Sequence, residues 1–377
     1  MLSTKKLGIM NKQSRCPHYP NCIGCCLTDV GEAKLFNDAQ NYFKEKEIAL
    51  PPLQQGASVH WRTRAKLAVR GTAKNPLIGL YKEGTHAVLD ISECIAHHPQ
   101  INAAIAQIKA WMKEQEIAPY DETTYRGALR YIQLAVERSS GRVQLVLVLN
   151  EPLPDVKRLY TPALFHSLWI NKNIRKDNVI FGKEWELVVG ERFLWEQFLG
   201  IEVAFLPQSF AQANPDLFTR LLASLKKQIE PNTRLIEYYA GVGVIGLVLS
   251  DICESIICSE IVPDGKECFD ASLKKLAPFH GEKLTYKTGS AAELLDLLPS
   301  GNAVLVDPPR KGIDPKLLNA LKVSQAKTLF YISCGWDSFK RDCDQLLEAG
   351  WKFQAAEAFL FFPGSAHLET LAILKKP

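Results

Sequence analysis

The sequence predicts an α/β protein in which a mostly parallel, doubly wound sheet forms the C-terminal domain and a mixed α+β domain precedes it. Two observations predict this architecture. From about residue 201 onward, short apolar segments alternate with amphipathic segments of helical period, as in a parallel sheet with crossover helices. Between residues 56 and 200, several stretches instead alternate apolar and polar residues, which indicates half-buried strands.

In the N-terminal part, the spacing of Leu35, Ala39 and Phe43 predicts a helix within residues 34–48. Residues 60–71 then alternate apolar and basic positions, which indicates a strand with a basic face. Further strands and a helix near residues 100–116 follow. The cations of the basic strand and of a second strand region are Arg62, Arg64, Lys66, Arg70, Arg126 and Arg130. They suit phosphate binding, and an ordinary solvated sheet face explains them equally well.

The C-terminal part begins with an amphipathic helix and continues as strands and helices in turn. Helices are predicted over residues 214–229, 264–276, 291–298, 314–323 and 336–350, with a further one starting near Val244. Strands are predicted over residues 233–239, 254–262, 283–289, 302–310 and 327–334. The last stretch, residues 353–374, lacks helical period, so we expect two closing strands around "PGSAH".

Length and composition allow two domains. The chain has 377 residues, of which 47% are hydrophobic, enough to bury a substantial core. No apolar run reaches the length of a membrane span and the start lacks a signal peptide's apolar stretch, so we expect a soluble, cytoplasmic monomer without membrane contact. A net charge of +4 does not by itself indicate a polyanionic partner. The expected segments are residues 1–55, a cysteine-rich segment and helix, 56–200, the α+β domain, and 201–377, the doubly wound domain.

Three of the ten cysteines lie close together in an irregular segment. Cys16, Cys22 and Cys25 have the spacing C-x5-C-x2-C, and Cys94 is a remote fourth candidate. Four thiolates in this arrangement favour a [4Fe-4S] cluster, whereas zinc sites more often show two C-x2-C pairs. A zinc site and a loop of reduced thiols remain as alternatives.

A glycine turn predicts a cofactor site on the C-terminal sheet. Gly241 and Gly243 follow the first strand, and Glu260 ends the next strand, where a carboxylate can accept hydrogen bonds from a ribose. This arrangement is shared by sites for NAD and for S-adenosylmethionine. "DPPRKG", from Asp307, ends a later strand with stiff backbone and two cations, which disfavours methylation of exocyclic amines and favours a phosphate-bearing target.

Cys334 ends the strand that follows "DPPR", so it is expected at the same edge of the sheet as Asp307. A helix beginning near Trp336 would lower the pKa of a neighbouring thiol. We therefore predict that Cys334 is a nucleophile.

These residues together resemble the RNA (uracil-C5) methyltransferases that depend on S-adenosylmethionine. The resemblance is carried by "FAQANP", "YYAGVGVIG", "SEI", "DPPRKGID", "YISC" and "FFPGSAHLET", which occur in the family's order and span nearly the whole chain. The N-terminal cysteines and "DISECIAHHP" are similar to the iron-sulfur branch that modifies 23S ribosomal RNA, in its shorter form without a TRAM domain.

The resemblance implies a function and a set of site residues. It implies a Rossmann-like methyltransferase domain over residues 201–377, an RNA-binding central domain and formation of 5-methyluridine in 23S ribosomal RNA. Cys334 would add to carbon 6 of the uracil, and Glu369 would accept the proton from carbon 5. The matching cofactor positions are Gln212, Tyr239, Glu260 and Asp307, and the matching cluster ligands are Cys16, Cys22, Cys25 and Cys94.

One departure from the family's pattern lies beside the nucleophile, where Gly335 stands in place of the usual asparagine. Three alternatives remain at this point: the same chemistry on transfer RNA, a non-catalytic RNA-binding iron-sulfur protein, and an NAD-linked oxidoreductase. The last leaves "DPPR", Cys334 and Glu369 unexplained.

Overall fold

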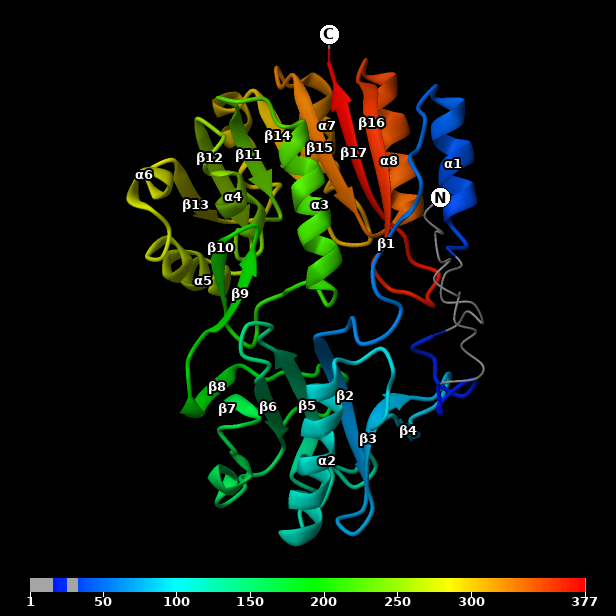
Figure 1. Cartoon of the computed structure of the whole chain (residues 1–377), viewed down its shortest axis with the longest axis vertical. Coiled ribbons are helices and arrows are strands. Elements are labelled where there is room, and N and C mark those ends of the chain that lie inside the picture. Colours follow the sequence, from blue (N-terminus) through cyan, green and yellow to red (C-terminus); the bar gives the residue numbers. More distant parts are fainter. Residues whose placement is uncertain (1–15, 26–32, 377) are drawn as a thin grey trace, which may run out of the picture.

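The computed structural model describes residues 16–25 and 33–376. Figure 1 shows two lobes along the long axis of the molecule, each built on one sheet. The smaller lobe contains the central part of the chain, and the larger contains the C-terminal part together with the early helix α1 (Phe36–Glu45). The boundaries expected after residues 55 and 200 stay predictions.

The smaller lobe is a seven-stranded sheet in the order β4-β3-β2-β5-β6-β7-β8. All neighbouring strands are antiparallel except β6 and β7. Helix α2 (Pro99–Glu114) covers one face, where its apolar side packs with alternate residues of the strands. The elements are β2 (Arg64–Gly71), β3 (Pro76–Tyr81), β4 (Val88–Asp90), β5 (Leu129–Val136), β6 (Val143–Leu149), the 3-10 helix η2 (Val156–Leu159), β7 (Phe165–Lys172) and β8 (Glu184–Gly190).

Strand β2 confirms the predicted alternation but not the predicted basic surface. Leu67 and Val69 are buried under α2. Arg70, however, is held by Tyr81, Glu122 and two backbone carbonyls, and Arg130 is buried and donates to backbone carbonyls. Since these two guanidinium groups are hydrogen-bonded to other groups of the domain, the six cations do not form one phosphate-binding face.

The larger lobe confirms the doubly wound sheet. Its eight strands have the order β1-β16-β17-β15-β14-β11-β12-β13, and only the pairs made by β17 are antiparallel. The closing strands β16 and β17 occur as predicted. The strands are β1 (Gln54–Gln55), β11 (Arg234–Tyr238), β12 (Ser255–Glu260), β13 (Leu284–Thr288), β14 (Ala303–Val306), β15 (Thr328–Ser333), β16 (Lys352–Leu360) and β17 (Glu369–Lys375).

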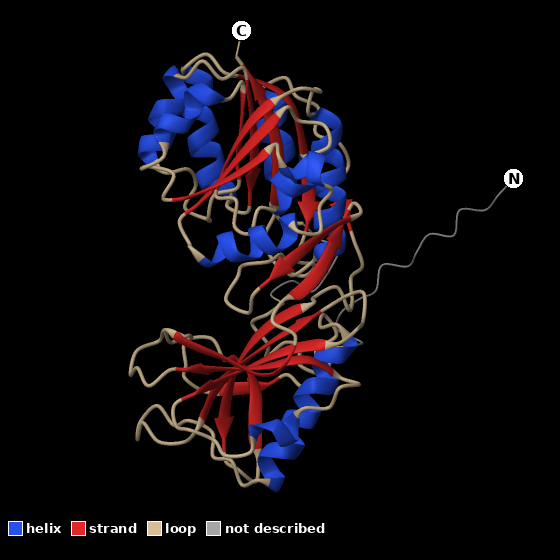
Figure 2. Cartoon of the chain, turned by 90° about the vertical axis from the view of Figure 1, so that its left-hand side faces the viewer, coloured by secondary structure: helices blue, strands red, loops and turns tan. Residues whose placement is uncertain are grey.

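Helices cover both faces of this sheet (Figure 2). One face packs against α3 (Pro215–Gln228), α4 (Val244–Leu249) and α5 (Asp264–Leu273). The other packs against α1, η3 (Leu295–Ser300), α7 (Pro315–Val323) and α8 (Trp336–Glu348), and the short α6 (Pro278–Gly281) lies outside both cores. The helix expected over residues 291–298 is wrong: a turn precedes η3, because the Glu293 carboxylate accepts from Ser290, and Pro299 lies within η3 itself.

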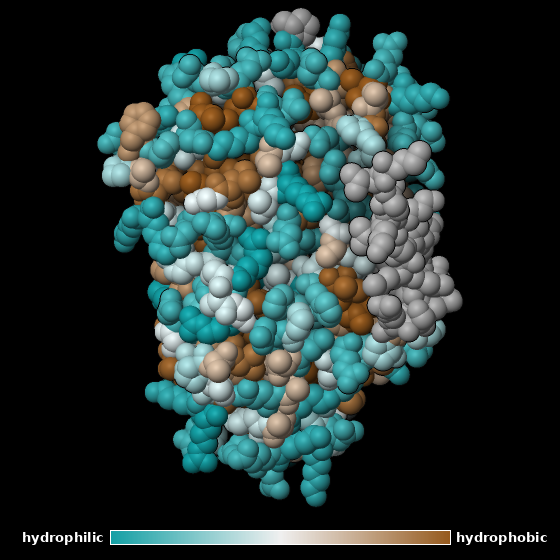
Figure 3. All heavy atoms as spheres, in the orientation of Figure 1, coloured by the Kyte–Doolittle hydropathy of each residue, from teal (hydrophilic) through white to brown (hydrophobic). Residues whose placement is uncertain are grey.

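The two lobes share a hydrophobic core. Tyr131 and Trp169 of the smaller sheet belong to the same buried cluster as Phe205 and Phe218 of the larger lobe. Phe205 ends the hairpin of β9 (Leu194–Phe198) and β10 (Ile201–Phe205), which connects the lobes. In Figure 3 the visible surface is mostly hydrophilic, with separate hydrophobic patches. Among the described helices, none has the length and apolar character needed to cross a bilayer.

Candidate active site

A cavity of about 720 Å³ opens at the carboxyl ends of β11, β12, β14 and β15. Parallel strands end at the same edge of a sheet, so residues far apart in sequence meet there. Strand β17 runs in the opposite direction, which brings its first residue to the same edge. The structure thereby brings together every residue predicted for catalysis and cofactor binding: Gln212, Tyr239, Glu260, Asp307, Cys334 and Glu369. Their individual roles stay predictions.

The glycine turn after β11 lines this cavity through Gly241 and Val242. Gly243 has φ +81°, and a side-chain carbon at this position would lie 2.5 Å from Phe269 Cδ2, so only glycine fits. The Gly241 N–H donates to Glu260 Oε2 over 3.0 Å, and the Val262 N–H donates to Glu260 Oε1, also over 3.0 Å. The Glu260 carboxylate is therefore held against the turn, where it can accept hydrogen bonds from ribose hydroxyls.

The segment that carries Gln212 is fixed by both lobes. The Thr63 N–H donates to Ala213 O over 2.9 Å, and the buried Asn214 side chain donates to Phe361 O over 3.0 Å. The same Asn214 side chain accepts from Leu217 N–H and so caps α3. Gln212 thus reaches the cavity from a loop anchored to the smaller lobe on one side and to the 361–368 loop on the other.

The residues predicted to react, Cys334 and Glu369, line the same cavity with Asp307 and Arg310. The pKa of the Cys334 thiol is raised to about 11, mainly by burial and then by Glu369 and Asp307, while Arg310 opposes the rise. Helix α8 does begin at Trp336, but the net lowering expected from it is wrong, because burial and two carboxyls outweigh a helix N-terminus.

Both carboxyls in this part of the cavity hold their protons more tightly than usual. Burial raises the pKa of Asp307 to about 7. Burial, and then the nearby Asp307, raise the pKa of Glu369 as well, while Arg310 lowers it. A carboxylate with a raised pKa is a stronger base, so Glu369 is suited to accepting a proton.

Two polar atoms that sequence reasoning missed also face this cavity. Ser259 Oγ and Gln208 Oε1 are buried and have no hydrogen-bond partner among the described residues. Buried polar groups are normally hydrogen-bonded, so both are suited to contacting a bound cofactor. Their only signal in the sequence is position: Ser259 precedes Glu260, and Gln208 precedes "SFAQAN".

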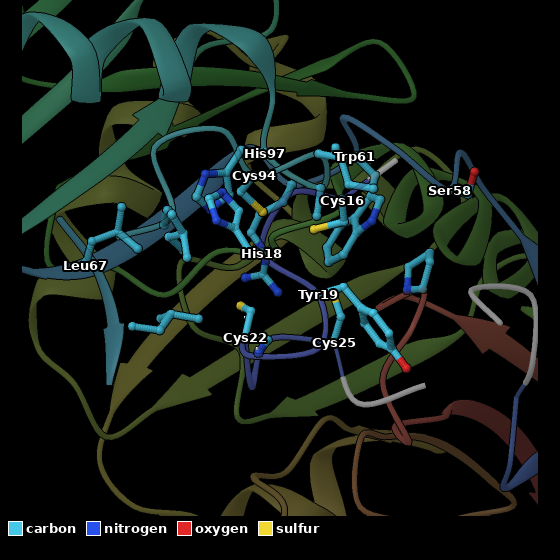
Figure 4. Close-up of a pocket in the computed structure, with 18 of the residues that line it drawn as sticks. Cys16, His18, Tyr19, Cys22, Cys25, Ser58, Trp61, Leu67, Cys94 and His97 are labelled. Carbon is cyan, nitrogen blue, oxygen red and sulfur yellow. Dashed lines mark hydrogen bonds between the residues drawn. The ribbon is translucent and has the colours of Figure 1, made fainter. Parts of the chain in front are cut away.

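A second cavity, of about 190 Å³, is lined by all four cysteines predicted as metal ligands. Figure 4 shows Cys16, Cys22 and Cys25 of the N-terminal segment around one space with Cys94, which comes from the loop after β4. His18 and His97 line the same cavity.

Backbone amides are directed at two of these sulfurs. Gly24 N–H donates to Cys22 Sγ over 3.4 Å, and the N–H groups of Ala96 and His97 oppose the effect of burial, which raises the pKa of Cys94. Such hydrogen bonds favour thiolates. Across residues 16–25 and 33–376, no three cysteine, histidine or acidic side chains lie close enough to hold a single metal ion.

Three comparisons relate this chain to known proteins. Residues 293–377 match the family model described as tRNA (Uracil-5-)-methyltransferase. An uncharacterized RNA methyltransferase of Protochlamydia amoebophila is 42% identical over 96% of this chain and 97% of its own length, and one of Clostridium acetobutylicum is 30% identical over 96% and 83%.

Among solved structures, the tRNA (uracil-54, C5)-methyltransferase of Pyrococcus abyssi in complex with S-adenosyl-L-homocysteine superposes with a TM-score of 0.79. It is 23% identical, and the match covers 94% of this chain and 86% of that one. At this identity, the likeness shows that the two chains share the fold.

Proposed function

The chain belongs to the RNA uracil-5-methyltransferase family, and from this premise we propose that it methylates carbon 5 of a uridine in RNA with S-adenosylmethionine as the donor. The observation that carries the proposal is the meeting of Cys334, Glu369 and Asp307 with the glycine turn and Glu260 in one cavity. A nucleophile, a base and a cofactor platform are what this reaction needs.

Cys334 starts the reaction. Carbon 5 of uracil is a poor nucleophile, so addition of the Cys334 thiolate to carbon 6 is needed to make an enolate that attacks the donor methyl group. When bound, S-adenosylmethionine supplies that methyl group on a cationic sulfur. The ionised forms of Cys334, Asp307 and Glu369 are favoured beside such a charge, which offsets the raised pKa of the thiol.

Glu369 completes the reaction. After methyl transfer, the proton on carbon 5 moves to the Glu369 carboxylate, the double bond re-forms and the Cys334 sulfur leaves carbon 6. Glu369 is 4% exposed, so bulk water has little access to its carboxylate, which supports its role as the base.

The cysteine cavity is proposed to hold a [4Fe-4S] cluster on Cys16, Cys22, Cys25 and Cys94. Four cysteines line one cavity, and the C-x5-C-x2-C spacing with a remote fourth cysteine favours a cluster over zinc, which more often shows two C-x2-C pairs. Methyl transfer needs no electron, so its role is to order the N-terminal segment.

The target is proposed to be a uridine of 23S ribosomal RNA, because the four-cysteine pattern resembles that branch of the family. A uridine in transfer RNA is the second candidate, favoured by the description of the matching family model. In either RNA the base must leave its stack to reach Cys334.

Mapping of 5-methyluridine in ribosomal and transfer RNA tests the proposal, using strains with the gene, without it, and with Cys334→Ala. We expect one or more sites in 23S ribosomal RNA to lose 5-methyluridine without the gene and with the variant. Loss confined to transfer RNA would select the second candidate. Unchanged modification in both RNAs would contradict the assigned reaction.

A further inference from the structure

Gly335, next to the nucleophile, is a glycine for reasons of space rather than backbone conformation. Its φ of −122° is open to any residue. A side-chain carbon at this position, however, would lie 2.4 Å from the Arg310 carbonyl oxygen and 2.7 Å from Ser338 Oγ. The backbone of "DPPR" therefore rests directly on the turn that presents Cys334, where an asparagine would force the two apart.

Ser338 holds this contact. Its Oγ lies 2.7 Å from Arg310 O and 2.9 Å from Gly335 O, and Ser338 is 8% exposed. One turn further along α8, the fully buried Asp342 accepts from Ile313 N–H over 2.8 Å. Arg341 of the same helix also donates to Lys311 O over 2.8 Å, so α8 holds the 310–313 segment at three points, of which Ser338 is the one beside the active site.

The contact decides where the Arg310 guanidinium lies. Arg310 lines the catalytic cavity with Cys334 and Glu369, and its Nη2 is 3.1 Å from His367 Nε2. Apart from the start of α8, the charged groups that act on Cys334 are Glu369 on β17, Asp307 after β14, and Arg310. Arg310 is the one cation of the three, and it favours the thiolate together with a backbone hydrogen bond of Cys334 itself.

We propose that Gly335 and Ser338 are positioning residues that dock the Arg310 backbone on the nucleophile turn and thereby keep the Arg310 guanidinium near the Cys334 sulfur. Gly335 lies directly before α8 and Ser338 lies on its first turn, so these two residues occupy the space beside Cys334. The inference rests on the proposed function, since it assumes that Cys334 reacts as a thiolate.

Alkylation of Cys334 by iodoacetamide tests the docking without RNA or cofactor. The full-length protein is alkylated between pH 7 and pH 9, and the rate is followed by mass spectrometry of the Cys334 peptide. Because only the thiolate reacts, Arg310→Gln is expected to slow alkylation about tenfold and Ser338→Ala about threefold at each pH. Ser324→Ala, which removes another serine-to-carbonyl hydrogen bond at the end of α7, is the matched control and should match the wild type.

A double-mutant cycle between Ser338→Ala and Arg310→Gln separates positioning of Arg310 by Ser338 from a general loosening of the structure around Cys334. If Ser338 acts through Arg310, Ser338→Ala has no further effect on the rate in the Arg310→Gln background. Gly335→Ala should slow alkylation in the same way, since its added carbon displaces Arg310 O. An unchanged rate in Ser338→Ala, or an equal slowing with and without Arg310, would overturn the docking. Unchanged 5-methyluridine in the mapping experiment, together with the expected alkylation effects, would instead count against the assigned reaction and leave the docking standing.

Discussion

The catalytic cavity and the cysteine cavity are assembled in different ways. The first lies at the ends of strands in a continuous sheet, with Tyr239, Asp307 and Cys334 directly after β11, β14 and β15. The second lies between a short irregular segment, residues 16–25, and the loop that carries Cys94. Strand ends thus bring the residues of the first cavity together, whereas the proposed cluster would complete the geometry of the second.

Replacing the base gives the largest expected effect and confines it to the catalytic cavity. With Glu369→Gln, the carbon 5 proton cannot leave, so turnover should fall at least about a thousandfold while the Cys334–RNA adduct accumulates. Denaturing gel electrophoresis with labelled RNA measures the adduct, and Cys334→Ala with Glu369→Gln is the control that cannot form it. A variant that turns over normally would remove Glu369 from the mechanism.

Removing a cysteine ligand should affect only the other cavity. Cys94→Ser is expected to abolish iron binding and the absorbance near 400 nm of anaerobically purified protein, because a cubane needs all four thiolates. S-adenosylhomocysteine affinity should stay within about twofold, since the glycine turn is part of the sheet domain. Cys343→Ser, which alters a buried cysteine of the core, controls for loss of a thiol. Full iron content in Cys94→Ser would contradict the ligand assignment.

Glycine substitutions compare the rigidity of the two cavities. Gly243→Ala combines φ +81° with a contact of 2.5 Å to Phe269, so we expect a loss of about 2–3 kcal/mol in the free energy of unfolding and weaker cofactor binding. Gly24→Ala meets Leu80 Cδ1 at 3.2 Å and Cys22 Sγ at 3.4 Å, so the loss should stay below about 1 kcal/mol. Denaturant unfolding measures both free-energy losses. Equal losses in the two variants would contradict the expected difference in rigidity between the two cavities.

The pH dependence of stability isolates Asp307. Its pKa is raised to about 7 by burial, so the folded state holds a proton that the unfolded chain releases near pH 4. Its ionisation therefore costs stability increasingly as pH rises from about 4 to about 7. Asp307→Asn, which stays neutral, should be more stable than the wild type by up to about 4 kcal/mol at pH 8, the cost of a pKa raised from about 4 to about 7, and equal to it near pH 4. A stabilisation that does not change with pH would show that burial of the charge is not the cause.

Much of the fold followed from local patterns. The alternation of strands and helices after residue 201 predicted the doubly wound sheet, because apolar period reports which face of an element is buried. The predicted helix over residues 291–298 was wrong. The apolar spacing there suits a helix, but the Ser290–Glu293 turn and Pro299 restrict the regular structure to η3. The predicted basic face was wrong for Arg70 and Arg130. Alternation indicates the face of the sheet on which a side chain lies, but not the groups that it contacts there.

The sequence was enough to predict the order of most elements, the glycine turn, Cys334 at a strand end and the spacing of the four cysteines, since each depends on residue type and local period. Only the tertiary structure decided how groups distant in the chain affect one another. The raised pKa of Cys334 depends on burial and on Asp307 and Glu369, and the need for Gly335 depends on the Arg310 carbonyl oxygen. Both depend on distances across the sheet edge, which are set when the strands pair and the helices pack.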